Sequence, residues 1–216
     1  GIVPVYLLRK ESRSSASLDG GRYYTFARDG GGGEAGSLLL GTEDTLEEAV
    51  IAAAERSGER ITTAESCTGG GLGSALTEVP GSSEIYLGGV VSYSYEMKER
   101  LLGVPRELLE SRGAVSPECA EAMARGAEER LRGSVQIAIT GIAGPGGGTP
   151  TKPVGLVYMA RIHRGVSVLY EFRFSGKRRE VRSRSVEAAL LLLLDALEPP
   201  EELLLETIDG KRLTAG

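Results

Sequence analysis

The sequence contains little of what metal-binding and disulfide-bonded proteins need. It has two cysteines, Cys67 and Cys119, without C-x-x-C spacing, and one histidine, His163. A disulfide scaffold or a zinc site built from clustered His, Cys and carboxylate ligands is therefore not expected. One histidine also argues against a Ser–His–Asp triad unless it lies in the site. His163 falls in a predicted strand near a hairpin end, between Arg161 and Arg164, so we expect it to face solvent.

The sequence also lacks an excess of positive charge and a long apolar run. Its formal net charge is −5, whereas a protein that neutralises the phosphates of DNA or RNA shows a basic domain. The longest purely apolar run, Ala188–Leu194, is far shorter than the ~20 residues of a membrane-spanning helix, and Gly1–Leu8 is too short for a signal peptide. We therefore expect no nucleic-acid partner, no membrane partner and a cytoplasmic location.

What the sequence does contain divides into three parts. Residues 1–44 hold a short apolar strand, Val3–Leu8, then serines, glycines and charges, and a possible second strand, Arg22–Phe26. Such a composition is typical of a linker or a loose hairpin, and we interpret this part as an N-terminal extension or the remnant of an upstream domain. Residues 45–198 carry a regular pattern and form one predicted domain. Residues 199–216, which begin with two prolines, form a C-terminal tail.

Helices and strands alternate along residues 45–198. Thr45 and Glu48 have the spacing of a capping box at the start of the first helix. Ser116 followed by Pro117 is a typical N-cap and first helical residue. Apolar patterns predict strands over residues 61–64, 88–94, 135–140, 154–162 and 166–174, and helices over 45–57, 96–102, 106–111 and 177–197, with others ending near 76 and beginning at 117. This alternation predicts an α/β sandwich with a largely parallel sheet and one antiparallel hairpin, formed by the last two strands.

Two glycine-rich segments directly follow predicted strands, at residues 66–71 and 141–149. Ligands of open α/β sheets bind beyond the carboxyl ends of the strands, so both segments are candidate binding loops. Consecutive glycines also allow backbone N–H groups to converge on an anion. For residues 141–149, a flexible connection between strands explains the glycines equally well.

Ser66 is the first candidate for chemistry, because it stands between a strand and the glycine-rich start of a helix. Free N–H groups of residues 67–70 at such a place suit an oxyanion or a phosphate. A serine before a helix is more often only an N-cap, and the position by itself favours that role. The glycines at 69–71 weaken the N-cap interpretation, since each costs a helix roughly 1 kcal/mol relative to alanine. The adjacent Glu65 has two equally supported roles, orienting the nucleophile or binding backbone.

A nucleophilic serine needs a base, and lysine is scarce enough to survey. The G-x-S-x-G and S-x-x-K signatures are both absent around Ser66. Lys98 stands five residues after Tyr93, just past a predicted strand, where partial burial lowers the pKa of a lysine enough for it to act as a base. Spacing alone favours the alternative, a solvated Lys98 that pairs with a glutamate on a surface helix.

The last predicted helix begins with cations, although a helix N-terminus prefers acidic residues. These cations are Lys177, Arg178 and Arg179. A bound phosphate would resolve the conflict. For Lys177 and Arg179, side chains lying along a tolerant surface are an equally good explanation.

Six motifs follow one another in the order in which a known family carries them. They are AESCTGG at Ala64–Gly70, PGSS at Pro80–Ser83, GGVVSYS at Gly88–Ser94, GAVS at Gly113–Ser116, TGIAGPGG at Thr140–Gly147 and KPVG at Lys152–Gly155. Over residues 45–197, this set resembles the C-terminal domain of the CinA-type competence/damage-inducible proteins, the nicotinamide-nucleotide amidase family. The resemblance implies a three-layer α/β/α sandwich that hydrolyses nicotinamide mononucleotide to nicotinate mononucleotide and ammonia, and it makes residues 45–198 an amidase domain.

The resemblance also implies roles for individual residues. Ser66 corresponds to the family's nucleophile, Lys98 to its lysine and Tyr93 to a supporting tyrosine, which overturns the N-cap and surface-lysine interpretations. Among the cations of the last helix only Arg178 matches a family residue, because the family usually has an acid in place of Lys177. The expected substrate-binding residues are Cys67, Thr68, Gly69, Gly70, Thr140, Gly141, Gly144, Gly146, Gly147 and Arg178.

We therefore expect a metal-free and cofactor-free amidohydrolase that acts as a homo-oligomer on a small nucleotide substrate. Ser66 attacks the carboxamide carbon, and neutral Lys98 takes its proton. Tyr93 relays or positions that proton, while N–H groups from Cys67 to Gly69 hold the oxyanion. Tyr95, where the family most often has asparagine, departs from the pattern. Two alternatives stay open: a non-catalytic nucleotide-binding module that serves an upstream domain or a partner, and an amidase for another carboxamide.

Overall fold

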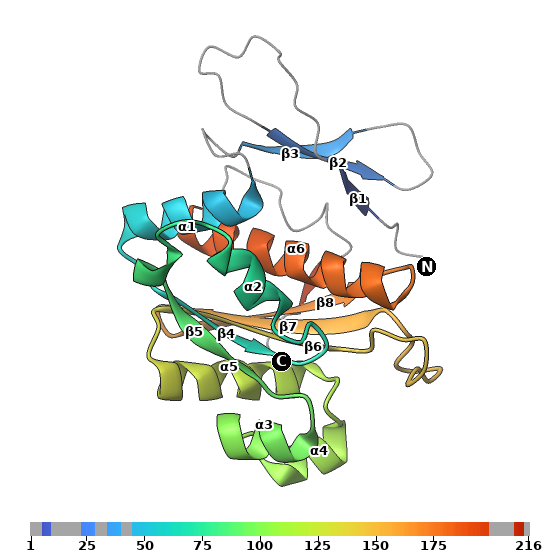
Figure 1. Ribbon diagram of the computed structural model, residues 1–216. Helices are drawn as coiled ribbons and strands as arrows, with labels where there is room; N and C mark the ends of the chain where they lie inside the picture. The colour runs from blue at the N-terminus through green and yellow to red at the C-terminus, as the bar shows by residue number, and fades with distance from the viewer. Residues whose placement is uncertain (1–5, 10–22, 29–33, 40–44, 199–209, 214–216) are drawn as a thin grey trace.

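The computed structural model describes residues 6–9, 23–28, 34–39, 45–198 and 210–213, which form two β-sheets and six α-helices (Figure 1). The smaller sheet is antiparallel, and its strands are β1 (Tyr6–Arg9), β2 (Tyr23–Arg28) and β3 (Glu34–Leu39). β1 and β2 overlap the two strands expected in the N-terminal segment, whose first residues lie outside the described part of the chain. β3 was not predicted.

The larger sheet has the strand order β5-β4-β6-β7-β8-β9. Its strands are β4 (Ile61–Glu65), β5 (Tyr86–Val91), β6 (Val135–Gly141), β7 (Leu156–His163), β8 (Val166–Arg173) and β9 (Gly210–Leu213). The parallel core has β4 between β5 and β6, and β7 with β8 forms the expected antiparallel hairpin. The antiparallel part is larger than that hairpin, because β7 also pairs with β6, and β9, from the segment interpreted as a tail, pairs with β8.

Helices cover both faces of this sheet, which confirms the α/β/α sandwich. Figure 1 shows α1, α2 and α6 over one face and α3, α4 and α5 over the other. The helices are α1 (Leu46–Ser57), α2 (Gly71–Thr77), α3 (Tyr95–Leu102), α4 (Arg106–Arg112), α5 (Pro117–Leu131) and α6 (Arg178–Leu197), and a short 3₁₀ helix spans Ser82–Glu84.

The central strand β6 shows how the two faces differ, because alternate residues of a strand point to opposite sides. Ile137 and Ile139 belong to the buried cluster beneath α1, α2 and α6. Ala138, between them, belongs to the second cluster, together with Ala120 and Ala124 of α5. Because the residues are small on both α5 and β6, the helix lies close against the sheet. Helices on both sides of the sheet therefore bury both faces of β6.

The predicted helix caps are confirmed. Thr45 Oγ1 accepts a hydrogen bond from Glu48 N at 3.2 Å, and Glu48 Oε2 accepts one from Thr45 N at 3.1 Å. Ser116 Oγ likewise accepts from Cys119 N at 3.1 Å.

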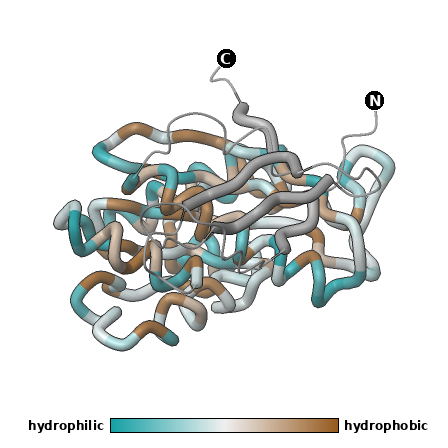
Figure 2. The backbone as a smooth tube through the Cα atoms, turned by 90° about the horizontal axis from the view of Figure 1, so that it is seen from above, coloured by the Kyte–Doolittle hydropathy of each residue, from teal (hydrophilic) through white to brown (hydrophobic). Residues whose placement is uncertain are grey.

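Viewed from above, hydrophobic and hydrophilic segments alternate along the chain, as expected for helices and strands that are buried on one side (Figure 2). Among the described residues, no helix is both long and apolar enough to cross a membrane.

Candidate active site

The carboxyl ends of the three parallel strands bring the predicted catalytic residues to one edge of the sheet. Ser66 directly follows β4, and its N–H donates to Ile139 O of β6 at 3.0 Å. Ser92 directly follows β5, and its N–H donates to Glu65 O of β4 at 2.9 Å. A cavity of about 210 Å³ opens at this edge, in agreement with the general position of ligand sites in such sheets. The predicted residues that line it are Ser66, Cys67, Tyr93, Lys98, Thr140, Gly141 and Arg178.

Lys98 is buried next to Ser66. Its Nζ lies 2.9 Å from Ser66 Oγ, and its side chain is fully buried. The surface-lysine interpretation is therefore wrong. Burial lowers the pKa of Lys98 below its ordinary 10.5, because the charged form loses its hydration. The lysine is thus shifted toward the neutral amine that a base requires.

Three oxygen atoms surround the Lys98 amine. Nζ donates to Ser66 Oγ at 2.9 Å and to Ser92 O at 2.7 Å, and it lies 3.5 Å from Tyr93 O. These three acceptors match the three N–H donors of a protonated lysine. When the amine loses one proton, its lone pair is within reach of the Ser66 hydroxyl.

The sequence of α3 explains how a lysine comes to be buried. Ser94 caps the helix by accepting from Met97 N at 3.1 Å. Lys98 and Leu102, four residues apart and therefore on one face, are the buried residues of α3. The cap fixes the start of the helix, and the buried position of Leu102 fixes which face turns inward.

The thiol beside Ser66 does not compete with it as a nucleophile. Cys67 also lines the cavity, but burial raises the pKa of its thiol to about 12. The reactive form of cysteine is the thiolate, so this side chain stays protonated and inert near neutral pH. Ser66, paired with Lys98, is therefore the candidate nucleophile of the cavity.

Of the two roles predicted for Glu65, orienting Ser66 or binding backbone, the structure shows the second. Its carboxylate accepts from Leu72 N at 2.9 Å and from Gly73 N at 3.0 Å. These N–H groups belong to the first turn of α2, where no helical acceptor is available. Glu65 therefore fixes α2 relative to β4, and it does not contact Ser66 through its carboxylate.

The loop after Ser66 requires its glycines, and it supplies fewer oxyanion donors than expected. Gly69 and Gly70 have φ angles of +61° and +93°, which side chains with a Cβ adopt only under strain. The Gly69 N–H donates to Ser66 O at 3.0 Å, so the expectation that it holds an oxyanion is corrected. Within the described residues the N–H groups of Cys67 and Thr68 have no such acceptor, and they are the candidate donors. Thr68, Gly69 and Gly70 do not line the cavity.

Arg178 and Tyr93 contact each other at the cavity. Arg178 Nη1 donates to Gly144 O at 2.8 Å, and its Nη2 donates to the Tyr93 hydroxyl at 3.0 Å. Tyr93 is 61% exposed. Within the described residues its hydroxyl makes no hydrogen bond with Ser66 or Lys98, so no direct contact supports the expected proton relay through Tyr93.

Part of the second glycine-rich loop lies at the cavity. Gly141 lines the cavity, and Gly144 takes part through the carbonyl that holds Arg178. Gly146 and Gly147 are not among the lining residues. Thr140 lines the cavity, but its hydroxyl donates to Ala114 O at 2.7 Å, which leaves it less available to a substrate.

One residue that contacts the loop after Ser66 (residues 67–70, the nucleophile loop) was missed from the sequence. Arg182 donates from Nε to Cys67 O at 3.2 Å and from Nη2 to Thr68 O at 3.0 Å. The available signal was its spacing, since it follows Arg178 by four residues on α6 and therefore shares its helix face.

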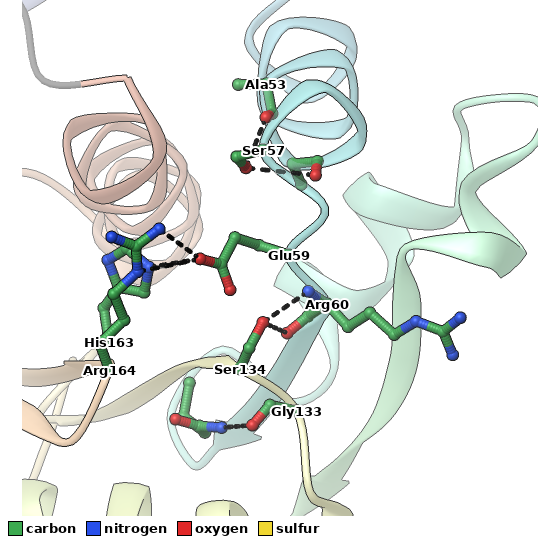
Figure 3. Close-up of polar contacts among 10 residues, drawn as sticks. Ala53, Ser57, Glu59, Arg60, Gly133, Ser134, His163 and Arg164 are labelled. Atoms are coloured by element: carbon green, nitrogen blue, oxygen red, sulfur yellow. Dashed lines mark hydrogen bonds and ion pairs between the residues drawn. The ribbon is translucent and has the colours of Figure 1, made fainter.

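The single histidine lies away from the cavity, at the opposite end of the sheet strands. His163 Nε2 lies 2.9 Å from Glu59 Oε1, which also accepts from Arg164 Nη2 at 3.2 Å (Figure 3). The expectation that His163 faces solvent is wrong, because its side chain contacts Glu59 and is only 19% exposed. The His163 bond is the main cause that lowers the pKa of Glu59. In residues 45–198, no three His, Cys, Asp or Glu side chains lie close enough together to hold a metal ion.

Comparison with known proteins identifies the family of residues 43–197. The family model of the CinA C-terminal domain matches residues 43–197. A CinA-like protein of Parasynechococcus marenigrum is 58% identical over 119 residues, which cover 55% of this chain and 28% of the relative. A putative competence-damage inducible protein of Moorella thermoacetica is 47% identical over 163 residues, 75% of this chain and 39% of the relative. This chain thus spans about a third of the length of these relatives.

Solved structures share the fold at clear sequence identity. The crystal structure of a competence/damage-inducible protein from Agrobacterium tumefaciens matches with a TM-score of 0.69 and 43% identity, over 70% of this chain and 93% of that one. A competence or damage-inducible protein from Enterobacter asburiae matches with a TM-score of 0.68 and 37% identity, over 72% of this chain and the whole of that one.

Proposed function

The chain belongs to the CinA C-terminal domain family, and we propose that it hydrolyses the carboxamide of nicotinamide mononucleotide, with Ser66 as nucleophile and Lys98 as base. The observation that carries this proposal is the distance of 2.9 Å between Lys98 Nζ, fully buried, and Ser66 Oγ. A serine within hydrogen-bond reach of a base with a lowered pKa is the arrangement that activates a hydroxyl for attack on an acyl carbon.

The reaction proceeds in two halves. Ser66 Oγ bonds to the carboxamide carbon as its proton passes to Lys98 Nζ, and the carbonyl oxygen becomes an oxyanion near the N–H groups of Cys67 and Thr68. The C–N bond then breaks, and the leaving nitrogen takes the proton from Lys98 and departs as ammonia. Lys98, neutral again, accepts a proton from water as the water attacks the acyl carbon. Collapse returns the proton to Ser66 and releases nicotinate mononucleotide.

The size and charge of the site support a nucleotide with an aromatic amide. A cavity of about 210 Å³ is smaller than the ~300–1,000 Å³ of pockets that enclose a whole ligand. It suits the pyridine carboxamide, while the ribose phosphate extends outward. Arg178, which lines the cavity and is exposed, is a suitable partner for that phosphate, because guanidinium groups bind phosphate with two parallel hydrogen bonds.

Ammonia release from nicotinamide mononucleotide tests the proposal. The parent chain should release ammonia and nicotinate mononucleotide in equal amounts. Ser66→Ala should abolish release while it still binds the substrate. Ser83→Ala, an exposed serine outside the cavity, is the matched control and should behave as the parent. A parent that binds the nucleotide without releasing ammonia would be a binding module, and a Ser66→Ala variant with most of its activity would overturn the serine mechanism.

A further inference from the structure

Arg182 connects α6 to the peptide units that follow Ser66. Its Nε donates to Cys67 O at 3.2 Å and its Nη2 donates to Thr68 O at 3.0 Å. One guanidinium thus holds two successive carbonyls of the nucleophile loop. We propose that Arg182 is a positioning residue, which keeps the loop in the geometry that Ser66 and its oxyanion donors need; this inference rests on the proposed function.

Because the peptide bond is planar, a hydrogen bond to the carbonyl oxygen of one residue also fixes the direction of the N–H group of the next residue. In a trans peptide the C=O of one residue and the N–H of the next point in opposite directions. When Arg182 holds Cys67 O toward α6, the Thr68 N–H must point away from α6. When it holds Thr68 O, the Gly69 N–H is fixed in the same way, and this N–H donates to Ser66 O at 3.0 Å. Both peptide units next to the nucleophile are therefore oriented by one side chain.

The loop is also shaped to lie against this guanidinium. A Cβ placed on Gly69 would be only 3.4 Å from Arg182 Nη2, so the backbone passes in contact with the side chain. The φ of Gly69 is +61°, and Thr68 is 1% exposed. Arginine suits this place better than lysine, because its rigid planar group presents several donors at fixed angles whereas an ammonium is a single point.

The position of Arg182 on α6 adds a second consequence. Arg178, the proposed phosphate ligand, lies four residues earlier on the same helix face. One rigid helix therefore carries both the group that holds the far end of the substrate and the group that orients the nucleophile loop. A shift of the loop relative to α6 would disturb the distance between these two parts of the site.

A fluorophosphonate that reacts with activated serines tests the role of Arg182 independently of the natural substrate. In this reaction Ser66 Oγ bonds to phosphorus, fluoride leaves, and the serine proton passes to Lys98. The labelling rate is measured for the parent, Arg182→Ala and Arg182→Lys. Arg179→Ala serves as the matched control, because Arg179 is an exposed arginine of the same helix with no hydrogen bond to the loop. Arg182→Ala should label about 100-fold more slowly, which is the cost of a misplaced reacting group, Arg182→Lys should be intermediate, and Arg179→Ala should match the parent.

Chemical rescue separates positioning from a general role in folding. Arg182 and Arg179 both line a cleft of about 380 Å³ on α6, through which a small cation can reach the place of a deleted guanidinium. Millimolar methylguanidinium should restore labelling of Arg182→Ala at least in part and leave the parent and Arg179→Ala unchanged. If Arg182→Ala does not fold, Arg182→Lys is compared with the parent in its place.

The outcomes distinguish this inference from the proposed function. An Arg182 variant that folds and labels within threefold of the parent, or a slow Arg182→Ala without rescue, would overturn the positioning role. A parent that labels normally but releases no ammonia from nicotinamide mononucleotide would overturn the substrate assignment and leave the role of Arg182 standing. A parent that does not label at all would overturn both.

Discussion

Arg178 donates from Nη2 to the hydroxyl of Tyr93 at 3.0 Å, and this hydrogen bond joins the first turn of α6 to the segment that follows β5. Residues 85 positions apart in the chain thereby meet at the cavity. The second terminal nitrogen of the guanidinium, Nη1, donates to Gly144 O. The Tyr93 hydroxyl therefore helps to orient the Arg178 side chain. The backbone carbonyl of Tyr93 lies 3.5 Å from Lys98 Nζ.

Replacing Tyr93 with phenylalanine separates positioning from proton transfer. Tyr93→Phe loses only the hydroxyl that accepts from Arg178, and a net hydrogen bond of about 0.5–1.5 kcal/mol corresponds to a loss of roughly 2- to 10-fold in kcat/KM. Because Arg178 is the proposed phosphate ligand, the loss should appear mainly in KM. Steady-state kinetics on nicotinamide mononucleotide measure both constants. A fall of kcat by about 100-fold or more, the size of a general acid–base contribution, would instead support a relay through Tyr93.

Removing the Arg178 side chain tests the phosphate assignment. Hydrogen bonds to charged groups contribute about 1.5–3 kcal/mol, so the parent should prefer nicotinamide mononucleotide over nicotinamide riboside by about 10- to 150-fold in kcat/KM. Arg178→Ala should lower activity on the nucleotide and leave activity on the riboside nearly unchanged. The comparison needs two substrates and two proteins. Equal losses on both substrates would show that Arg178 supports the fold or the nucleophile loop.

The cluster around Glu59 should matter for stability and not for activity. Its pKa is lowered from 4.5, chiefly by the hydrogen bond with His163, so the ionised carboxylate stabilises the fold at pH values above 4.5 and loses this effect as the pH falls through the lowered pKa. Glu59→Gln should reduce the free energy of unfolding at pH 7 by about 1–3 kcal/mol. The difference from the parent should shrink as the pH falls below 4.5.

Urea unfolding of both proteins from pH 7 down to about pH 3 measures this difference. His163→Gln is the companion variant, and at pH 7 it should keep the parent rate of ammonia release. A large loss of activity in His163→Gln without a loss of stability would bring the histidine into the mechanism, against its position beside Val135, at the end of β6 opposite the cavity.

Local sequence signals predicted the elements of the main domain because their causes are local. The cap of α1 by Thr45 and Glu48 and the cap of α5 by Ser116 depend on residues three positions apart, and both are present. The pairing of β7 with β6 and of β9 with β8 could not be predicted in this way. It depends on which strands meet at a distance in the chain, which an alternation of patterns leaves open.

The candidate site shows the same difference between features with local causes and features that depend on contacts between residues distant in the chain. Ser66 could be proposed from its motif, and Lys98 from the scarcity of lysine and the family resemblance. Spacing alone pointed to an exposed lysine, because the burial of Lys98 depends on the packing of α3 through Leu102. Arg182 was missed, since its contacts to Cys67 and Thr68 join residues more than 110 positions apart. The role of Gly69 was misjudged because an N–H near a nucleophile is available only if no carbonyl already accepts from it.

The pH dependence of kcat/KM for nicotinamide mononucleotide, measured for the parent and for Lys98→Arg, tests the central claim most directly. Burial lowers the pKa of Lys98 below 10.5, so the parent rate should rise with pH as the amine loses its proton at that lowered pKa. Lys98→Arg should lose about 100- to 10,000-fold at every pH, nearly as much as Lys98→Ala, because arginine keeps its charge but cannot give up a proton. A Lys98→Arg protein within a few-fold of the parent, with the same pH profile, would contradict the claim that Lys98 is the base for Ser66.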